Sequence, residues 1–150
     1  VFPGWVDQLE IATLLGASSL GLAAYSPGAK QGLPNKLFEY MSFGVPVISS
    51  LGGEAATEIK THRFGRSYLA GNGVDLAEVL IAVLADSARL TQMATAARER
   101  FESTYRQSVV YERYADLVEQ LAGDDTCRKI DPKGLTATSI PESLKENHDV

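Results

Sequence analysis

KQGLPNKLFEYMSFGVPVISS, residues 30–50, is the stretch that decides the fold, because it combines a flexible loop, a short helix, a turn and a buried strand. Pro34 fixes φ and lacks an N–H, which suits the first position of a helix. Gly44 and Pro46 suit the end of that helix. The helix carries one carboxylate, Glu39, in its middle. Since free N–H groups at a helix N-terminus attract anions, the stretch predicts a binding site for a ligand such as a phosphate.

Strand and helix patterns alternate along the rest of the chain. The apolar runs expected as strands cover residues 1–6, 20–25, 45–49 and 65–69. The expected helices cover residues 7–16, 34–43, 54–61 and 76–86, with further helices within 90–121. The run LGLAAY is continuously apolar, which is typical of a parallel strand covered on both faces. The sequence therefore predicts an α/β fold, a doubly wound parallel sheet with helices on both faces and further helices towards the C-terminus.

Two of the expected helices show a capping-box spacing at their start. Asp7 is followed by Glu10, and Asp75 is followed by Glu78. In a capping box the two side chains satisfy free backbone donors reciprocally. The second pair stands at the start of LAEVLIAVLAD, residues 76–86, whose nearly continuous apolar character predicts a largely buried helix.

Apolar residues at helical spacing within 90–101 and 110–121 predict core-facing helix surfaces. Trp5 and Tyr25 are expected to be packing residues, because large aromatic side chains usually lie in the interior. A ring near the end of a strand, such as that of Tyr25, could also border a bound base.

Composition restricts the class of protein. The chain has 150 residues and a formal net charge of −5, and such an acidic chain with no basic run is not expected to bind nucleic acid. The single cysteine, Cys127, excludes an intramolecular disulfide, and His62 and His148 are too few for a zinc site. We expect one domain over residues 1–121 and a polar, poorly ordered tail over 122–150.

Two loops leave the carboxyl ends of expected strands, residues 26–33 and 49–53. In a doubly wound sheet, ligands bind at this edge, so the loops would face one crevice if their strands are neighbours. The Gly-x-Gly-x-x-Gly pattern of dinucleotide-binding folds is absent, since Gly52 and Gly53 lack the third glycine at its place. The pattern favours a different phosphorylated ligand.

The order of these elements, with the words PNK, FEYM and GVPVI, resembles a known family. Over residues 1–121 the chain is similar to the second half of the C-terminal, donor-binding domain of family-4 retaining glycosyltransferases of the GT-B fold. The resemblance implies a Rossmann-like domain of a metal-independent hexosyltransferase that needs no cofactor. The donor would be a UDP- or GDP-linked sugar, and the acceptor an unknown saccharide or lipid-linked saccharide. It also implies a cytoplasmic enzyme, with association of the full-length protein at a membrane surface as a further expectation.

The resemblance carries over to individual residues. Glu39 takes the place of the carboxylate that accepts hydrogen bonds from the ribose hydroxyls of the nucleotide. The family often has a second glutamate that contacts the donor sugar, and Gln31 stands there in this chain. The backbone and helix start expected beside the diphosphate and the sugar comprise Gly32, Leu33, Pro34, Asn35 and Lys36. Lys36 would add a point charge for the phosphates, or be a solvated surface lysine.

The catalytic residues are unknown from this sequence. In the family, the cations that neutralise the diphosphate leaving group precede this region, and acceptor-binding residues lie in an N-terminal domain. The chain begins at Val1 without methionine, so we expect a part of a longer protein that has no transferase activity alone.

Other interpretations stay open. The same fold could serve a non-catalytic nucleotide-binding or interaction module, or a GT-B-type sugar-nucleotide epimerase. Glu39 could form only a local contact one helical turn away, for example with Asn35. Glu54 and Glu58 lie near the start of an expected helix, where the helix dipole favours acids without any ligand.

Overall fold

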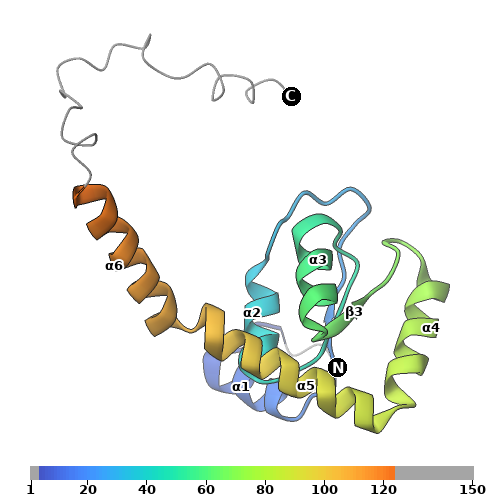
Figure 1. Ribbon diagram of the computed structural model, residues 1–150. Helices are drawn as coiled ribbons and strands as arrows, with labels where there is room; N and C mark the ends of the chain where they lie inside the picture. Colours follow the sequence, from blue (N-terminus) through green and yellow to red (C-terminus); the bar gives the residue numbers. More distant parts are fainter. Residues whose placement is uncertain (1–3, 124–150) are drawn as a thin grey trace. The chain divides into compact units, whose positions relative to one another are not determined.

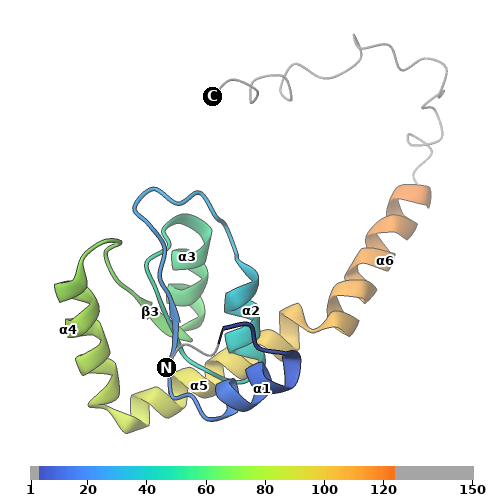
Figure 2. The same cartoon turned by 180° about the vertical axis from the view of Figure 1, so that it is seen from behind.

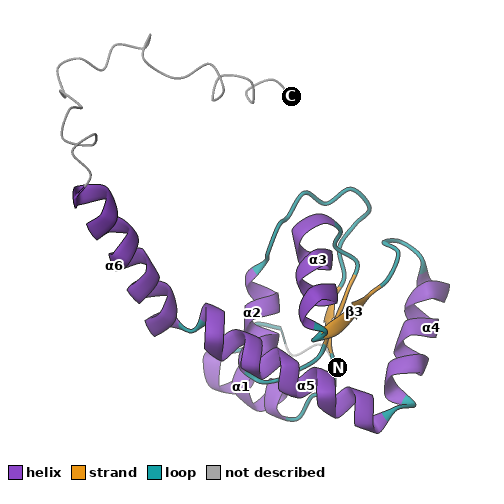
Figure 3. Ribbon diagram, viewed as in Figure 1, coloured by secondary structure: helices purple, strands orange, loops and turns teal. Residues whose placement is uncertain are grey.

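The computed structural model describes residues 4–123, and its centre is a three-stranded sheet in the order β1-β2-β3 (Figures 1 and 3). Its strands are β1 (Gly21–Ala23), β2 (Val47–Ser49) and β3 (Gly65–Ser67). Both pairings are parallel, with Gly21 opposite Val47 and Val47 opposite Gly65. The predicted parallel α/β sheet is therefore confirmed. The strands are shorter than predicted, because β1 and β3 each end two residues earlier and β2 begins two residues later.

Helices connect the strands and continue after them. They are α1 (Gln8–Gly16), α2 (Asn35–Ser42), α3 (Gly53–His62), α4 (Gly73–Leu84), α5 (Ser87–Arg100) and α6 (Gln107–Gly123). A π-helical turn, η1 (Phe101–Tyr105), directly follows α5. The chain divides into two compact units, Val1–Val109 and Val110–Val150. The sheet and the helices α1 to α5 belong to the first unit, which Figure 2 shows from behind.

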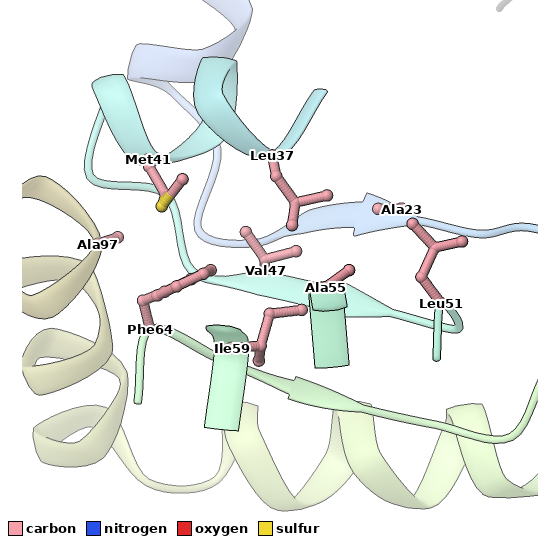
Figure 4. Close-up of a cluster of buried hydrophobic side chains, with 9 residues drawn as sticks. All are labelled: Ala23, Leu37, Met41, Val47, Leu51, Ala55, Ile59, Phe64 and Ala97. Carbon is pink, nitrogen blue, oxygen red and sulfur yellow. The ribbon is translucent and has the colours of Figure 1, made fainter. Parts of the chain in front are cut away.

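Both faces of the sheet are covered, as predicted. Successive side chains of a strand point to opposite faces, so Val47 and Ile48 enter different clusters. On one face, α2 and α3 contribute the buried cluster of Figure 4: Ala23, Leu37, Met41, Val47, Leu51, Ala55, Ile59, Phe64 and Ala97. On the other face, Ile48 packs with Val83 of α4 and Met93 of α5. Each large side chain buried in this way stabilises the fold by about 1.5–3 kcal/mol.

Proline and glycine define the ends of α2, with one difference from the prediction. Pro34 (φ −73°, ψ 150°) is the N-cap rather than the first helical residue. Its extended ψ angle excludes it from the helix, although its φ angle is compatible with one. At the other end Gly44 has φ 65°, and its N–H donates to the carbonyl of Met41 while Val45 donates to that of Tyr40. This Schellman arrangement turns the chain towards β2.

Only the first of the two predicted capping boxes is present. The Asp7 carboxylate accepts from the Glu10 N–H at 2.9 Å, and the Glu10 carboxylate accepts from the Asp7 N–H at 2.8 Å. The Asp75 prediction is wrong, because α4 begins earlier, at Gly73. There Asn72 Oδ1 accepts from two backbone N–H groups of the first turn, and Asp75 instead accepts from the N–H of Leu69.

Two predictions about the first unit are also wrong. Residues 4–6 do not form a strand, since Gly4 has φ 82° and the neighbouring side chain of Trp5 is fully exposed. The helix predicted to be largely buried, α4, buries only Val83. Ile81 is 69% exposed, because α4 places a single side on the sheet and turns the rest of its apolar surface to solvent.

The apolar side of α6 is not a core face either. Its exposed apolar side chains include Val110, Tyr114, Leu117, Val118 and Leu121. Within the described part of the second unit, α6 is the one helix, so that part offers no second element on which this side could pack. The predicted tail, with Cys127 and His148, lies outside the described residues.

A polar network joins α3 to the end of α5. Glu58 Oε1 accepts from Arg100 Nε and from the Tyr105 hydroxyl, each at 2.6 Å. The Arg100 guanidinium also lies 5.2 Å from the centre of the Tyr105 ring, which stacks obliquely on Phe38. Burial raises the pKa of Glu58, but the hydrogen bonds and positive charge of its partners outweigh burial and lower it. Glu58 therefore acts as a structural tie between these elements.

The Glu58→Gln substitution is expected to destabilise the fold by about 2 kcal/mol at neutral pH, because a charged, hydrogen-bonded acceptor is lost. A group with a lowered pKa stabilises the folded state above its ordinary value, here 4.5, and this contribution disappears as the pH falls through its folded pKa. Urea unfolding at several pH values should therefore show the variant and wild type converging in acid. The exposed Glu99→Gln control should match wild type throughout. If the free energies of unfolding of wild type and Glu58→Gln differed by the same amount at every pH, the ionised Glu58 carboxylate would not be the stabilising group.

Candidate functional site

The segments that follow β1 and β2 are held side by side at the carboxyl edge of the sheet. The Tyr25 N–H donates to Ser50 Oγ at 2.7 Å, and that hydroxyl donates to the Tyr25 carbonyl at 3.0 Å. The Ser50 N–H donates to the Ala23 carbonyl at 3.2 Å. Because β1 and β2 are neighbours, the two predicted loops do face one another.

The loop after β1 also approaches the elements that follow β2 and β3, at the top of the view in Figure 1. A β-carbon added to Gly32 would lie 2.9 Å from Glu54 Oε2, so the backbone of Gly32 lies against the first turn of α3. One added to Gly71 would lie 3.3 Å from Cγ of Pro27. All three post-strand loops of the described sheet thus meet at one edge.

The helices of the first unit differ in how their N-termini are capped. Side chains of Asp7, Asn72 and Asp86 cap α1, α4 and α5. Neither α2, after Pro34, nor α3, after Gly52, has a side-chain cap. The first N–H groups of a helix need partners, and a bound anion is one way to supply them. Both α2 and α3, which lack a side-chain cap, follow the joined loops.

Glu39 lies on the exposed side of α2, together with Asn35 and Lys36. Its carboxylate forms no hydrogen bond or ion pair with any residue in the described range 4–123, so the local contact with Asn35 is not present. The next residue, Tyr40, donates to the Leu22 carbonyl at 3.1 Å and so holds α2 against β1. Burial and the negative charge of Glu39 raise the pKa of Tyr40.

The other predicted site residues have different environments. Gln31 is exposed. Leu33 is half-buried and packs against the core cluster, so only its backbone is available to a ligand. Sequence reasoning did not identify the pair of hydrogen bonds between Tyr25 and Ser50, which we call the Tyr25–Ser50 clasp, or the approach of Glu54 to Gly32. The pair of serines at the end of the expected strand was the available signal for the clasp, since hydroxyl groups there can join neighbouring loops.

No metal site is indicated in the described part of the chain. Among residues 4–123, no three His, Cys, Asp or Glu side chains are grouped so that they could hold a metal ion. Within the same range, no helix has the length and apolar character needed to cross a membrane.

Comparison with known proteins agrees with this fold. Residues 1–116 match the model of the family described as "Glycosyl transferase-like". The chain is 28% identical over 122 residues to "Amylovoran biosynthesis glycosyltransferase AmsK" of Erwinia amylovora. It is 27% identical over 123 residues to "Putative colanic acid biosynthesis glycosyltransferase WcaL" of Escherichia coli K12. Each alignment covers 79% of this chain but 30% of the relative, so the chain spans under a third of their length.

Proposed function

The chain belongs to the Glycosyl transferase-like family, and from this premise we propose that it binds a nucleoside-diphosphate sugar at the carboxyl edge of its sheet. The observation that carries the proposal is the meeting of the joined loops with the uncapped N-termini of α2 and α3, beside the unpaired carboxylate of Glu39. A diphosphate suits the uncapped helix N-termini, because it supplies acceptors for several N–H groups. A ribose diol suits the Glu39 carboxylate, because its two hydroxyls can donate to the two carboxylate oxygens.

Each ligand group has a proposed partner. The N–H groups at the starts of α2 and α3 donate to the diphosphate, with Lys36 adding positive charge. The two oxygens of Glu39 accept from the 2′- and 3′-hydroxyls of the ribose. Gln31 hydrogen-bonds a sugar hydroxyl through its amide. The base is uracil or guanine.

The longer protein that would contain this domain is proposed to transfer the sugar to a saccharide acceptor with retention of configuration and without a metal ion. The names of the two relatives refer to glycosyltransferases of amylovoran and colanic acid biosynthesis, which supports a saccharide acceptor. Cations on the leaving diphosphate are where electrostatic catalysis acts, and the resemblance places them in another segment. We therefore propose that residues 1–150 bind the donor but do not turn it over, and that the full protein works in the cytoplasm.

Amide-detected NMR titration with UDP and GDP tests this proposal. Shift changes are expected in residues 26–39, which include Glu39, and in residues 50–55, with none in α6. A nucleoside without phosphates should bind more weakly, because it lacks the groups that accept the charge-assisted hydrogen bonds. Absence of shift changes in both of these segments with either nucleotide would contradict the proposal.

A further inference from the structure

A second site is indicated at the other end of α3, where a cavity of 940 Å³ is lined by α3, β3, α4 and α5. Figure 1 shows β3 between α3 and α4, with α5 below them. α3 begins beside the loops of the nucleotide site and runs back along the sheet, and its ten residues span about 15 Å. The cavity is bordered by α3 from Ala56 onward and shares no lining residue with the loops 26–36 and 50–55 of the proposed nucleotide site.

The polar lining of the cavity is basic. Four side chains carry the charge, namely Lys60, Arg63, Arg66 and Arg89, and the other polar side chains of the lining are His62, Ser67 and Gln92. Among the residues that the structure describes, no carboxylate lines the cavity. His62 Nε2 lies 3.5 Å from Oε2 of Glu58, and Glu58 itself does not line the cavity. The four charged side chains are exposed and form no ion pair with any described residue, in a chain whose net charge is −5.

The helix dipole accounts for part of this cluster only. Lys60 and His62 lie in the last turn of α3, where the dipole favours cations. Arg66 lies on β3, which has no comparable dipole. Arg89 is the third residue of α5, where the dipole opposes a cation. Like charges from three elements therefore face one cavity against their mutual repulsion.

The backbone conformation of Arg63 is a second, independent observation. Arg63 caps α3 with φ 57° and ψ 25°, in the left-handed region. Of the residues described, it is the one non-glycine residue with positive φ. Glycine adopts this conformation without steric cost and is the usual residue at such a position. A strained residue that contributes a cation to the cavity indicates that the cation is used.

We propose that this basic cavity binds a phosphate-bearing ligand. Three of the cations are arginines, whose planar guanidinium groups match phosphate oxygens in pairs. Buried apolar side chains, Ile59 and Met93, form part of the lining and would contact the group that carries the phosphate. The cavity volume is within the range of small-molecule sites, about 300–1,000 Å³.

The test uses inorganic pyrophosphate as the probe, with amide-detected NMR at constant low ionic strength. Shift changes are expected in residues 60–66 and 89–93. The Arg63→Gly/Arg89→Gln variant should weaken this binding by about tenfold or more, because two charge-assisted contacts are lost. Arg63→Gly alone should fold at least as stably as wild type, since glycine relieves the strained φ. The Arg106→Gln/Arg113→Gln control removes the same charge outside the cavity and should bind as wild type does.

A second experiment distinguishes a phosphate carried by a lipid headgroup from one carried by a soluble ligand. Vesicles containing phosphatidylglycerol replace pyrophosphate, and phosphatidylcholine vesicles serve as the neutral control. Selective loss of signal from residues 60–66 with the anionic vesicles would support a lipid headgroup, whereas shifts with pyrophosphate alone would support a soluble ligand. No response in either experiment would overturn the proposal, as would equal binding by the cavity variant and the control variant.

Discussion

Gly65→Ala is expected to destabilise the fold by about 3 kcal/mol, because β3 approaches β2 too closely for any side chain. A β-carbon at Gly65 would overlap the carbonyl oxygen of Val47 and lie 2.9 Å from its carbonyl carbon. These are backbone atoms at the centre of the sheet, so no flexible side chain can move aside. The strand would have to shift, and Phe64, which is completely buried, would shift with it.

Urea unfolding of Gly65→Ala measures this effect, and Gly73→Ala is the matched control. A β-carbon at Gly73 would meet nothing within 4 Å, so alanine there should be neutral or slightly stabilising. A loss below about 1 kcal/mol at Gly65 would show that β3 lies farther from β2 than described. If both substitutions lowered the free energy of unfolding equally, the cause would be a general effect of alanine and not the close approach at Gly65.

Glu39→Ala is expected to weaken UDP binding by about a hundredfold without destabilising the fold. Two hydrogen bonds to a charged acceptor would be lost, each near the lower end of the usual range of about 1.5–3 kcal/mol because Glu39 is exposed. Stability should be unchanged, because the carboxylate is exposed and has no partner among residues 4–123. Isothermal titration calorimetry checks the affinity. Glu112→Ala, the same charge change on α6, should bind UDP as wild type does.

The general fold followed from local patterns in the sequence. Continuous apolar runs predicted parallel strands. Pro34 and Gly44 marked the ends of α2, because the fixed φ of proline and the tolerance of glycine for positive φ are independent of tertiary context. The start of α4 could not be predicted in this way. Asn72 and Asp75 are both good caps, and Asp75 is instead bound to the N–H of Leu69, across a loop whose path the local sequence does not determine.

Burial was predicted less well than helix formation. The apolar run of α4 indicated burial on all sides, but the sheet provides one face, so Ile81 remains exposed. The same limit applies to the apolar side of α6. A sequence pattern shows that a side chain favours burial, but not whether another element is close enough to bury it.

The candidate site was predicted from position rather than from side-chain contacts. Loops at the carboxyl ends of neighbouring strands must meet, which the clasp between Tyr25 and Ser50 bears out. The basic cavity had no sequence signal, because Lys60 and Arg66 are well separated from Arg89 along the chain and only the packing of α5 beside β3 brings them together.

The most direct test of the nucleotide site is a double-mutant cycle between protein and ligand. UDP and its 2′,3′-dideoxy analogue are titrated into wild type and Glu39→Ala by calorimetry. If Glu39 accepts the ribose hydroxyls, loss of the diol should weaken binding to wild type by about a hundredfold and leave binding to Glu39→Ala nearly unchanged. An equal loss for both proteins would mean that Glu39 does not bind the ribose, and would contradict the account.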